Sequence, residues 1–268
     1  MRRIAEPRAV SDFVDELQSS GRYTFHKEQA IAALGVSEIA FVKSARRLAA
    51  KKRIVAARRG FYVIVPVEYR DAGSPPASWF VDDLMKFHSR PYYVGLLSAA
   101  ALHGAAHQQP QEFQVVTDTR LRSATVGRNR IRFFLKWRFA ETPTTEVKTE
   151  TGTMRVSTPE ATALDLVRYV GRVGHLGNVA TVLAELSERI NASDLVKAAQ
   201  TEVELSVVQR VGFLLDRFGS ARVTEPLAQW LATMRLRPVP LRPEQKPKTN
   251  EKDARWQIVL NERVEVDQ

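Results

Sequence analysis

The chain has 268 residues, with 40 Lys+Arg against 30 Asp+Glu and a formal net charge of +10. This length predicts about two domains rather than one small module. Cysteine is absent, which excludes disulfides and cysteine-ligated zinc and is compatible with a reducing cytoplasm. The N-terminus MRRIAEPRAV lacks the apolar core of a signal peptide, and no run approaches the roughly 18 apolar residues of a membrane span. We therefore expect a cytoplasmic protein without membrane contact.

Basic charge is concentrated near the N-terminus. Residues 1–70 hold 14 Lys+Arg and 7 Asp+Glu, so they contribute +7 of the net charge. No acidic residue occurs from Ile39 to Val67. The phosphate backbone of a nucleic acid is the partner that such a segment fits.

Two helices joined by a tight turn are predicted in this region, after an opening helix from Pro7 to Ser19 that packs against them. The first helix, His26 to Leu34, is followed by Gly35, which readily takes the positive-φ conformation of a helix C-cap. The second helix begins after Ser37, a suitable N-cap, and extends to about Arg53.

The second of these helices has an apolar face and a cationic face at about 100° per residue. The apolar face comprises Phe41, Val42, Ala45, Leu48 and Ala49. The opposite face comprises Lys43, Arg46, Arg47 and Lys51. We expect the helix to bury the first stripe and to present the second to a partner.

A short β-hairpin is predicted directly after this helix. Its strands, Ile54–Ala57 and Phe61–Val65, are rich in β-branched and aromatic residues, and Arg58, Arg59 and Gly60 form the turn. Helix, turn, basic helix and hairpin follow each other as in a winged helix-turn-helix, whose hairpin reaches a minor groove or the backbone beside it. The alternatives are a solvated charged face and a winged helix that contacts protein.

The predicted DNA contacts lie on the second helix and the hairpin. Early helix positions are best placed to touch base edges, whereas later positions and the hairpin mainly touch phosphates. The predicted set is Ser37, Ile39, Ala40, Lys43, Ser44, Arg46, Arg47, Lys51, Lys52, Arg53, Arg58 and Arg59.

The rest of the chain predicts a second domain of mixed α and β structure. Residues 71–78 (DAGSPPAS) are a predicted linker between a DNA-binding domain, residues 1–70, and a second domain, residues 79–268. Strands are expected at Glu112–Thr117, Arg130–Lys136 and Trp256–Leu260, the last one pairing with the sheet, and a hairpin at Glu146–Ser157. Helices are expected at Trp79–His88, Leu96–Ala106, Asn178–Ile190, Ser193–Gln200, Ser206–Phe218 and Pro226–Met234. The fold class is therefore α+β: a winged helix-turn-helix followed by an α/β domain with a small mixed sheet, several helices and a Pro-rich tail segment, residues 237–247.

The segment STPEATALDLVRYV predicts a further helix. Ser157 and Glu160 have the spacing of a capping box, and Pro159 is tolerated in a first turn. Asp165 lies within the apolar part of this helix, where we expect it to pair with Arg168.

Several residues in the second domain have the spacing of catalytic or metal sites, but we predict no such site. Glu146 and Lys148, with Asp82 or Asp118 upstream, match the skeleton of a metal-dependent nuclease, yet their flanks are polar rather than apolar. The pair His103 and His107 has metal-binding spacing without further ligands, which favours histidines that are hydrogen-bonded within the protein or lie on its surface. Gly171, Gly174 and Gly177 match no phosphate-binding fingerprint. Tyr92 and Tyr93 are interpreted as core residues rather than ligand contacts.

Four segments resemble one family. They are YYVGLLSAAALHG (Tyr92–Gly104), EFQVVT (Glu112–Thr117), RVSTPEATALDLV (Arg155–Val167) and the hairpin end RRGFYVI (Arg58–Ile64). Together they resemble the AbiEi family of antitoxins and transcriptional regulators from bacterial type IV toxin–antitoxin systems. The likeness extends from about residue 10 to 235, and the STPE and ALDL segment is its most specific part.

The resemblance implies two activities. The N-terminal domain would bind inverted repeats in the promoter of its own operon, as double-stranded DNA, and repress it. The C-terminal domain would counter a cognate nucleotidyltransferase toxin without forming a stable complex with it. We expect a monomer in solution that has no cofactor and is not an enzyme. The remaining alternatives are a ligand-sensing winged-helix transcription factor and a nuclease-like or phosphotransfer activity in the second domain.

Overall fold

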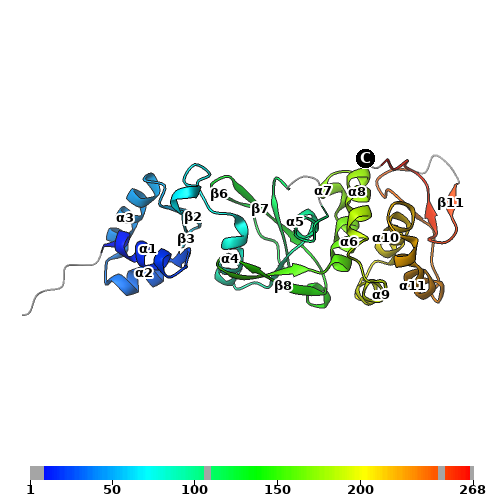
Figure 1. Ribbon diagram of the computed structural model, residues 1–268, viewed down its shortest axis with the longest axis horizontal. Helices are drawn as coiled ribbons and strands as arrows, with labels where there is room; N and C mark the ends of the chain where they lie inside the picture. Colours follow the sequence, from blue (N-terminus) through cyan, green and yellow to red (C-terminus); the bar gives the residue numbers. More distant parts are fainter. Residues whose placement is uncertain (1–8, 106–109, 247–250, 266–268) are drawn as a thin grey trace, which may run out of the picture.

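The computed structural model describes residues 9–105, 110–246 and 251–265. The molecule is elongated, with a helical N-terminal unit at one end, a β-sheet in the middle, and a helical region followed by a small sheet at the other end (Figure 1). The predicted α+β fold class is confirmed. None of the helices in the described part combines the length and the apolar character that crossing a bilayer requires.

The N-terminal unit, residues 9–70, has the element order of a winged helix-turn-helix. Its helices are α1 (Val10–Ser19), α2 (Lys27–Leu34) and α3 (Glu38–Ala50). Its strands are β1 (Thr24–His26), β2 (Ile54–Arg58) and β3 (Phe61–Ile64), which form an antiparallel sheet in the order β1-β3-β2. The three-residue strand β1 is absent from the sequence prediction, which places His26 in the helix that follows.

The turn between α2 and α3 is built by the two predicted caps. Gly35 ends α2 with a φ of 64° and donates its N–H to the carbonyl of Ile31. The Ser37 hydroxyl accepts from the backbone N–H of Ala40 at 3.3 Å and starts α3. Both predictions are confirmed.

The core of the N-terminal unit is aromatic. Phe25 of β1 stacks on Tyr62 of β3 and meets the edge of Phe41 from α3. Of the predicted apolar face of α3, Phe41, Ala45 and Leu48 are buried. Ala49 is exposed and that prediction is wrong, because this position lies about 80° around the helix from Phe41 and so falls beside the buried stripe.

The predicted linker, residues 71–78, is a packed part of the second domain. The Ser74 hydroxyl donates to the carbonyl of Val126 at 2.6 Å, and the Asn129 amide donates to both Ser74 and Pro75 at 2.7 Å. A Cβ added to Gly127, whose φ is 57°, would lie 2.5 Å from the carbonyl carbon of Gly73. Polar composition alone does not distinguish such a fixed connection from a flexible one.

The middle of the molecule is a six-stranded mixed sheet in the order β6-β7-β5-β4-β9-β8. Its strands are β4 (Tyr92–Val94), β5 (Phe113–Thr117), β6 (Ala124–Val126), β7 (Asn129–Leu135), β8 (Thr144–Thr149) and β9 (Gly152–Ser157). The pairs β5 with β7 and β4 with β9 are parallel, and the other pairs are antiparallel. The predicted longer strands and the β8–β9 hairpin are confirmed, whereas the three-residue strands β4 and β6 are missed.

Both faces of this sheet are covered. Neighbouring residues of β4 alternate, so that Tyr92 packs on the side of α4 (Val81–Phe87) and Tyr93 on the side of α5 (Leu96–Leu102). The prediction that both tyrosines are core residues is confirmed. The α4 side of the sheet also receives Phe61 from the N-terminal hairpin, so the two domains share one apolar cluster.

The helical region follows the sheet. Its helices are α6 (Pro159–Arg168), α7 (Val170–Val173), α8 (Leu176–Leu186), α9 (Ala192–Gln200), α10 (Leu205–Phe218) and α11 (Ala221–Ala232). The predicted start of the last helix at Pro226 is wrong, since α11 begins five residues earlier and tolerates this proline in its interior. The Gly171, Gly174 and Gly177 segment belongs to α7, the turn after it and the first turn of α8.

The tail folds back onto α10 rather than onto the main sheet. Strands β10 (Val239–Pro240), β11 (Lys252–Asp253) and β12 (Ile258–Val259) form a separate small sheet, so the prediction that Trp256–Leu260 pairs with the main sheet is wrong. The fully buried ring of Trp256 explains this placement. It lies directly on Gly212 of α10, where an added Cβ would lie 2.0 Å from the ring.

Candidate nucleic-acid interface and the buried polar network

One face of α3 carries cations that have no acidic neighbour. Lys43, Arg46, Arg47 and Lys51 are solvent-exposed. Within the described part of the chain, none of the four forms an ion pair with a carboxylate, and the side chain of Arg47 instead donates to the Ser44 hydroxyl at 3.0 Å. This face can therefore offer its full positive charge to a polyanion.

The first turn of α3 is apolar and exposed beside these cations. Ile39 exposes 70% of its surface, and Ala40 is also exposed. Glu38 is the acidic residue of this turn, and its carboxylate accepts from the Lys27 ammonium at 2.7 Å. That hydrogen bond lowers the pKa of Glu38 and raises the pKa of Lys27. The pairing offsets a negative charge that would otherwise repel phosphate.

The remaining predicted DNA contacts differ in their surroundings. Lys52 is exposed just after α3, but the side chain of Arg53 forms an ion pair with Asp15 of α1. In the hairpin, Arg59 is exposed. Arg58 is half-buried, and its guanidinium donates to the carbonyls of Arg122 and Ser123 in the second domain. Burial also lowers the pKa of Arg58.

The hairpin is therefore docked rather than free at its tip. Ala57 and Phe61 are buried against Phe80 and Val81 of the second domain, and the Phe61 ring lies 5.3 Å from that of Phe87. The predicted DNA contact of Arg58 stays a prediction, and in this structure its guanidinium contacts the second domain. Sequence pattern could identify the hairpin but not the domain against which its tip packs.

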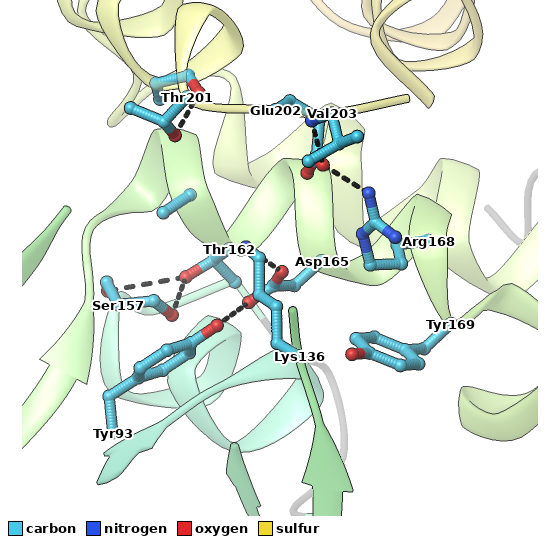
Figure 2. A network of polar contacts seen from close by, with 12 residues as sticks. Tyr93, Lys136, Ser157, Thr162, Asp165, Arg168, Tyr169, Thr201, Glu202 and Val203 are labelled. Atoms are coloured by element: carbon cyan, nitrogen blue, oxygen red, sulfur yellow. Dashed lines mark hydrogen bonds and ion pairs between the residues drawn. The ribbon is translucent and has the colours of Figure 1, made fainter. Parts of the chain in front are cut away.

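The second domain contains a buried ionic network, shown in Figure 2. Asp165 of α6 is completely buried, and one of its oxygens accepts from the Tyr93 hydroxyl at 2.7 Å. Its other oxygen accepts from the ammonium group of Lys136 at 2.7 Å. Burial, followed by the charge of Asp165, raises the pKa of Tyr93 well above its ordinary value. The network connects the sheet to α6.

The predicted pairing of Asp165 with Arg168 is wrong. Arg168 instead forms an ion pair with Glu202 (Figure 2). It also pairs with Glu204, and both glutamates precede α10. Asp165 faces the sheet, so its charge partner comes from the residue after β7, distant in sequence. Spacing along one helix could not reveal that partner.

The STPE segment has a structural role in this network. Thr158, not Ser157, is the N-cap of α6, because Pro159 occupies the first helical position and Thr158 accepts from the N–H of Ala161. The predicted capping box is thus wrong by one residue. The Ser157 hydroxyl lies 2.7 Å from that of Thr162, and the Glu160 carboxylate accepts from the N–H of Asn191. The motif joins β9 to α6 and to the start of α9.

The residues considered as catalytic candidates lie outside the network around Asp165. Glu146 and Lys148 are exposed on the edge strand β8, whereas Asp82 accepts from the Tyr92 hydroxyl at 2.9 Å and pairs with Lys86. Asp118 is exposed after β5. Among the described residues, no group of three or more His, Asp or Glu side chains is placed to hold a metal ion.

Of the two histidines with metal-binding spacing, only His103 lies among the residues that the structure describes. One ring nitrogen of His103 lies 2.7 Å from the carbonyl oxygen of Ser157, which accounts for its position after α5. His107 lies outside the described residues. The structure thus gives His103 a partner in the main chain rather than in a metal site.

Comparison with known proteins places the second domain in a family. Residues 93–217 match the family model of the AbiEi antitoxin C-terminal domain. These residues form an AbiEi antitoxin domain. The AbiEi domain begins within β4 and ends within α10, so it contains the Tyr93, Lys136 and Asp165 network and the STPE segment. The match covers residues 93–217 of the 268 and supports an antitoxin role in a toxin–antitoxin system.

The overall arrangement is shared with a solved structure. The crystal structure of the RV2827C protein from Mycobacterium tuberculosis aligns with a TM-score of 0.67 and 16% sequence identity, over 95% of this chain and 92% of that chain. At this identity the likeness shows a common fold alone. No curated protein sequence matches the chain.

One basic segment was missed by the sequence analysis. From Thr119 to Ala140 the chain has seven Lys+Arg and no acidic residue, a run comparable to the one in the N-terminal unit. It spans most of the β5–β6 connection, β6, β7 and the residues directly after β7. The run is visible in the sequence, but the alternation of arginine with isoleucine and phenylalanine predicts a strand and does not by itself indicate a binding surface.

Proposed function

We propose that the chain is a cytoplasmic DNA-binding antitoxin that represses its own operon, and that its AbiEi domain counters a cognate nucleotidyltransferase toxin. The observation that carries the DNA-binding half is the exposed face of α3, where Lys43, Arg46, Arg47 and Lys51 have no carboxylate partner in the described part of the chain. Unpaired cations on the second helix of a helix-turn-helix fit the phosphates that border a major groove.

The geometry of α3 suggests how a site would be recognised. Ile39 and Ala40 lie in the first turn, where an apolar side chain can contact a thymine methyl group, and Lys43 follows one turn later, within reach of guanine acceptors. Arg46, Arg47 and the residues after them would contact phosphates, which position the helix without specifying sequence. Inverted repeats would be occupied by two copies, one on each half-site, of a chain that is a monomer in solution.

A promoter reporter tests repression in cells. The upstream region of the operon is fused to a reporter gene, and the full chain is supplied with its native sequence or with Arg46→Ala and Arg47→Ala. We expect the native chain to repress and the variant to lose most of the repression. The matched control is Arg222→Ala with Arg235→Ala, because these arginines are also exposed and form no ion pair in the described residues but lie at the opposite end of the molecule. Equal repression by native and α3-variant chains would contradict the proposal.

The antitoxin half is supported by the AbiEi family match rather than by a catalytic constellation. Co-expression with the neighbouring nucleotidyltransferase toxin tests it, with growth as the readout. We expect the native chain to restore growth, and the Arg46→Ala and Arg47→Ala variant to restore it equally well. Toxin and antitoxin should elute separately on size exclusion, since no stable complex is proposed. Loss of protection in the α3 variant would refute the division of labour between the domains.

A further inference from the structure

The docked hairpin brings a second basic segment beside the helix-turn-helix. The Arg58 guanidinium donates to the carbonyls of Arg122 and Ser123, which lie in the connection between β5 and β6. Strands β2 and β6 are neighbours in space (Figure 1). Apolar packing of Ala57 and Phe61 against the second domain holds the hairpin in this place. The connection is therefore fixed next to the turn of the hairpin that follows α3.

Four arginines in the hairpin turn, the β5–β6 connection and the β6–β7 turn are exposed. We call Arg59, Arg120, Arg122 and Arg128 the loop arginines. Within residues 9–105, 110–246 and 251–265, none of them forms an ion pair.

Two other basic residues nearby are already paired. Arg130 and Arg132 of β7 both pair with Glu112. The acid at the start of the connection, Asp118, is exposed and forms no ion pair with these arginines in the described part of the chain. The loop arginines are thus the part of this basic segment whose charge is left uncompensated, beside a hairpin turn.

We propose that the loop arginines bind the phosphates of DNA that flanks the site read by α3, so that the DNA interface includes the second domain. The inference rests on the proposed DNA binding. Arginine pairs with phosphate through its planar fork of N–H groups, and clustered unpaired guanidiniums repel one another unless a polyanion lies between them. In this arrangement Arg58 acts as a positioning residue, because it fixes the β5–β6 connection to the hairpin. The side chains of Arg59 and Arg122 are then free to contact the phosphates of the DNA.

The test compares full-length chains on two duplexes. One duplex carries the upstream site alone, and the other carries the same site with about one helical turn of flanking DNA on each side. The variant is Arg120→Gln with Arg122→Gln. It removes two charges but keeps the backbone carbonyls that Arg58 contacts. The control is Arg222→Gln with Arg235→Gln, which removes the same charge at the far end of the molecule.

The expected result is specific to the longer duplex. The plot of log K against log salt should become less steep by about 2 for the loop variant, about 1 for each arginine, while its preference for the site over scrambled DNA stays unchanged. On the short duplex it should bind like the native chain. A native slope for the loop variant on the long duplex, with the control also native, would overturn the inference and leave the proposed function standing. Absence of site-specific binding by the native chain would overturn both.

Discussion

Removal of the Asp165 carboxylate should destabilise the AbiEi domain severely. The side chain is 0% exposed and accepts two hydrogen bonds of 2.7 Å, from the Tyr93 hydroxyl and from the ammonium group of Lys136. The Lys136 side chain is itself only 9% exposed. The substitution Asp165→Ala therefore leaves a buried ammonium without its counter-charge, and a buried phenol without its acceptor.

The size of the effect follows from the cost of an uncompensated buried charge. Breaking one partner of a buried ion pair lowers the free energy of unfolding by about 3–5 kcal/mol. Since domains are stable by roughly 5–15 kcal/mol in total, the variant should retain only part of its stability. We expect a loss of about 3–5 kcal/mol.

Urea denaturation followed by circular dichroism measures this loss, provided that the m-value stays unchanged. A second variant, Asp165→Ala with Lys136→Met, separates the charge from the lost contacts. It should be more stable than Asp165→Ala alone, because no unpaired ammonium remains. A single-variant loss below about 1 kcal/mol, or a double variant less stable than the single one, would refute the reasoning.

Three further predictions concern other parts of the molecule. The folded protein raises the pKa of Tyr93, so the neutral Tyr93 hydroxyl contributes fully to the free energy of unfolding below about pH 10. Above that pH the contribution falls by about 1.4 kcal/mol per pH unit, and Tyr93→Phe should therefore make the free energy of unfolding decrease less steeply at alkaline pH. Gly212→Ala should cost about 1–3 kcal/mol and expose Trp256, seen as a red shift of its fluorescence, and an unshifted spectrum would contradict the packing. Arg59→Ala should reduce the salt slope of DNA binding by about 1, and Arg58→Ala by less, since Arg58 donates within the protein; equal reductions would contradict its assignment.

Local features of the N-terminal unit could be predicted from sequence because short-range physics determines them. Gly35 and Ser37 cap adjacent helices through their own backbone and side chain, and the periodicity of α3 separates its buried stripe from its cations. The hairpin could be predicted because β-branched and aromatic residues lie on both sides of a turn that contains glycine. The predicted DNA-contact set, by contrast, stays a prediction, since no nucleic acid is present in the structure.

Long-range contacts could not be predicted in the same way. Asp165 takes its partner from Lys136, 29 residues earlier, and no spacing rule indicates that choice. Likewise the docking of Arg58 on the β5–β6 connection joins residues more than 60 positions apart. Strands of three residues, such as β4, are too short to show alternation. These contacts determine how the two domains meet, and therefore which arginines remain free.

The most direct test of the account is a competition titration of the full chain on its own upstream DNA against a scrambled duplex of equal length and composition, at physiological salt. We expect the upstream duplex to be bound tighter by a factor of about 10³ or more. Lys43→Ala should lower that ratio, whereas Arg47→Ala should weaken binding to both duplexes equally. Equal and weak binding of both duplexes by the native chain would contradict the claim that α3 recognises a specific site.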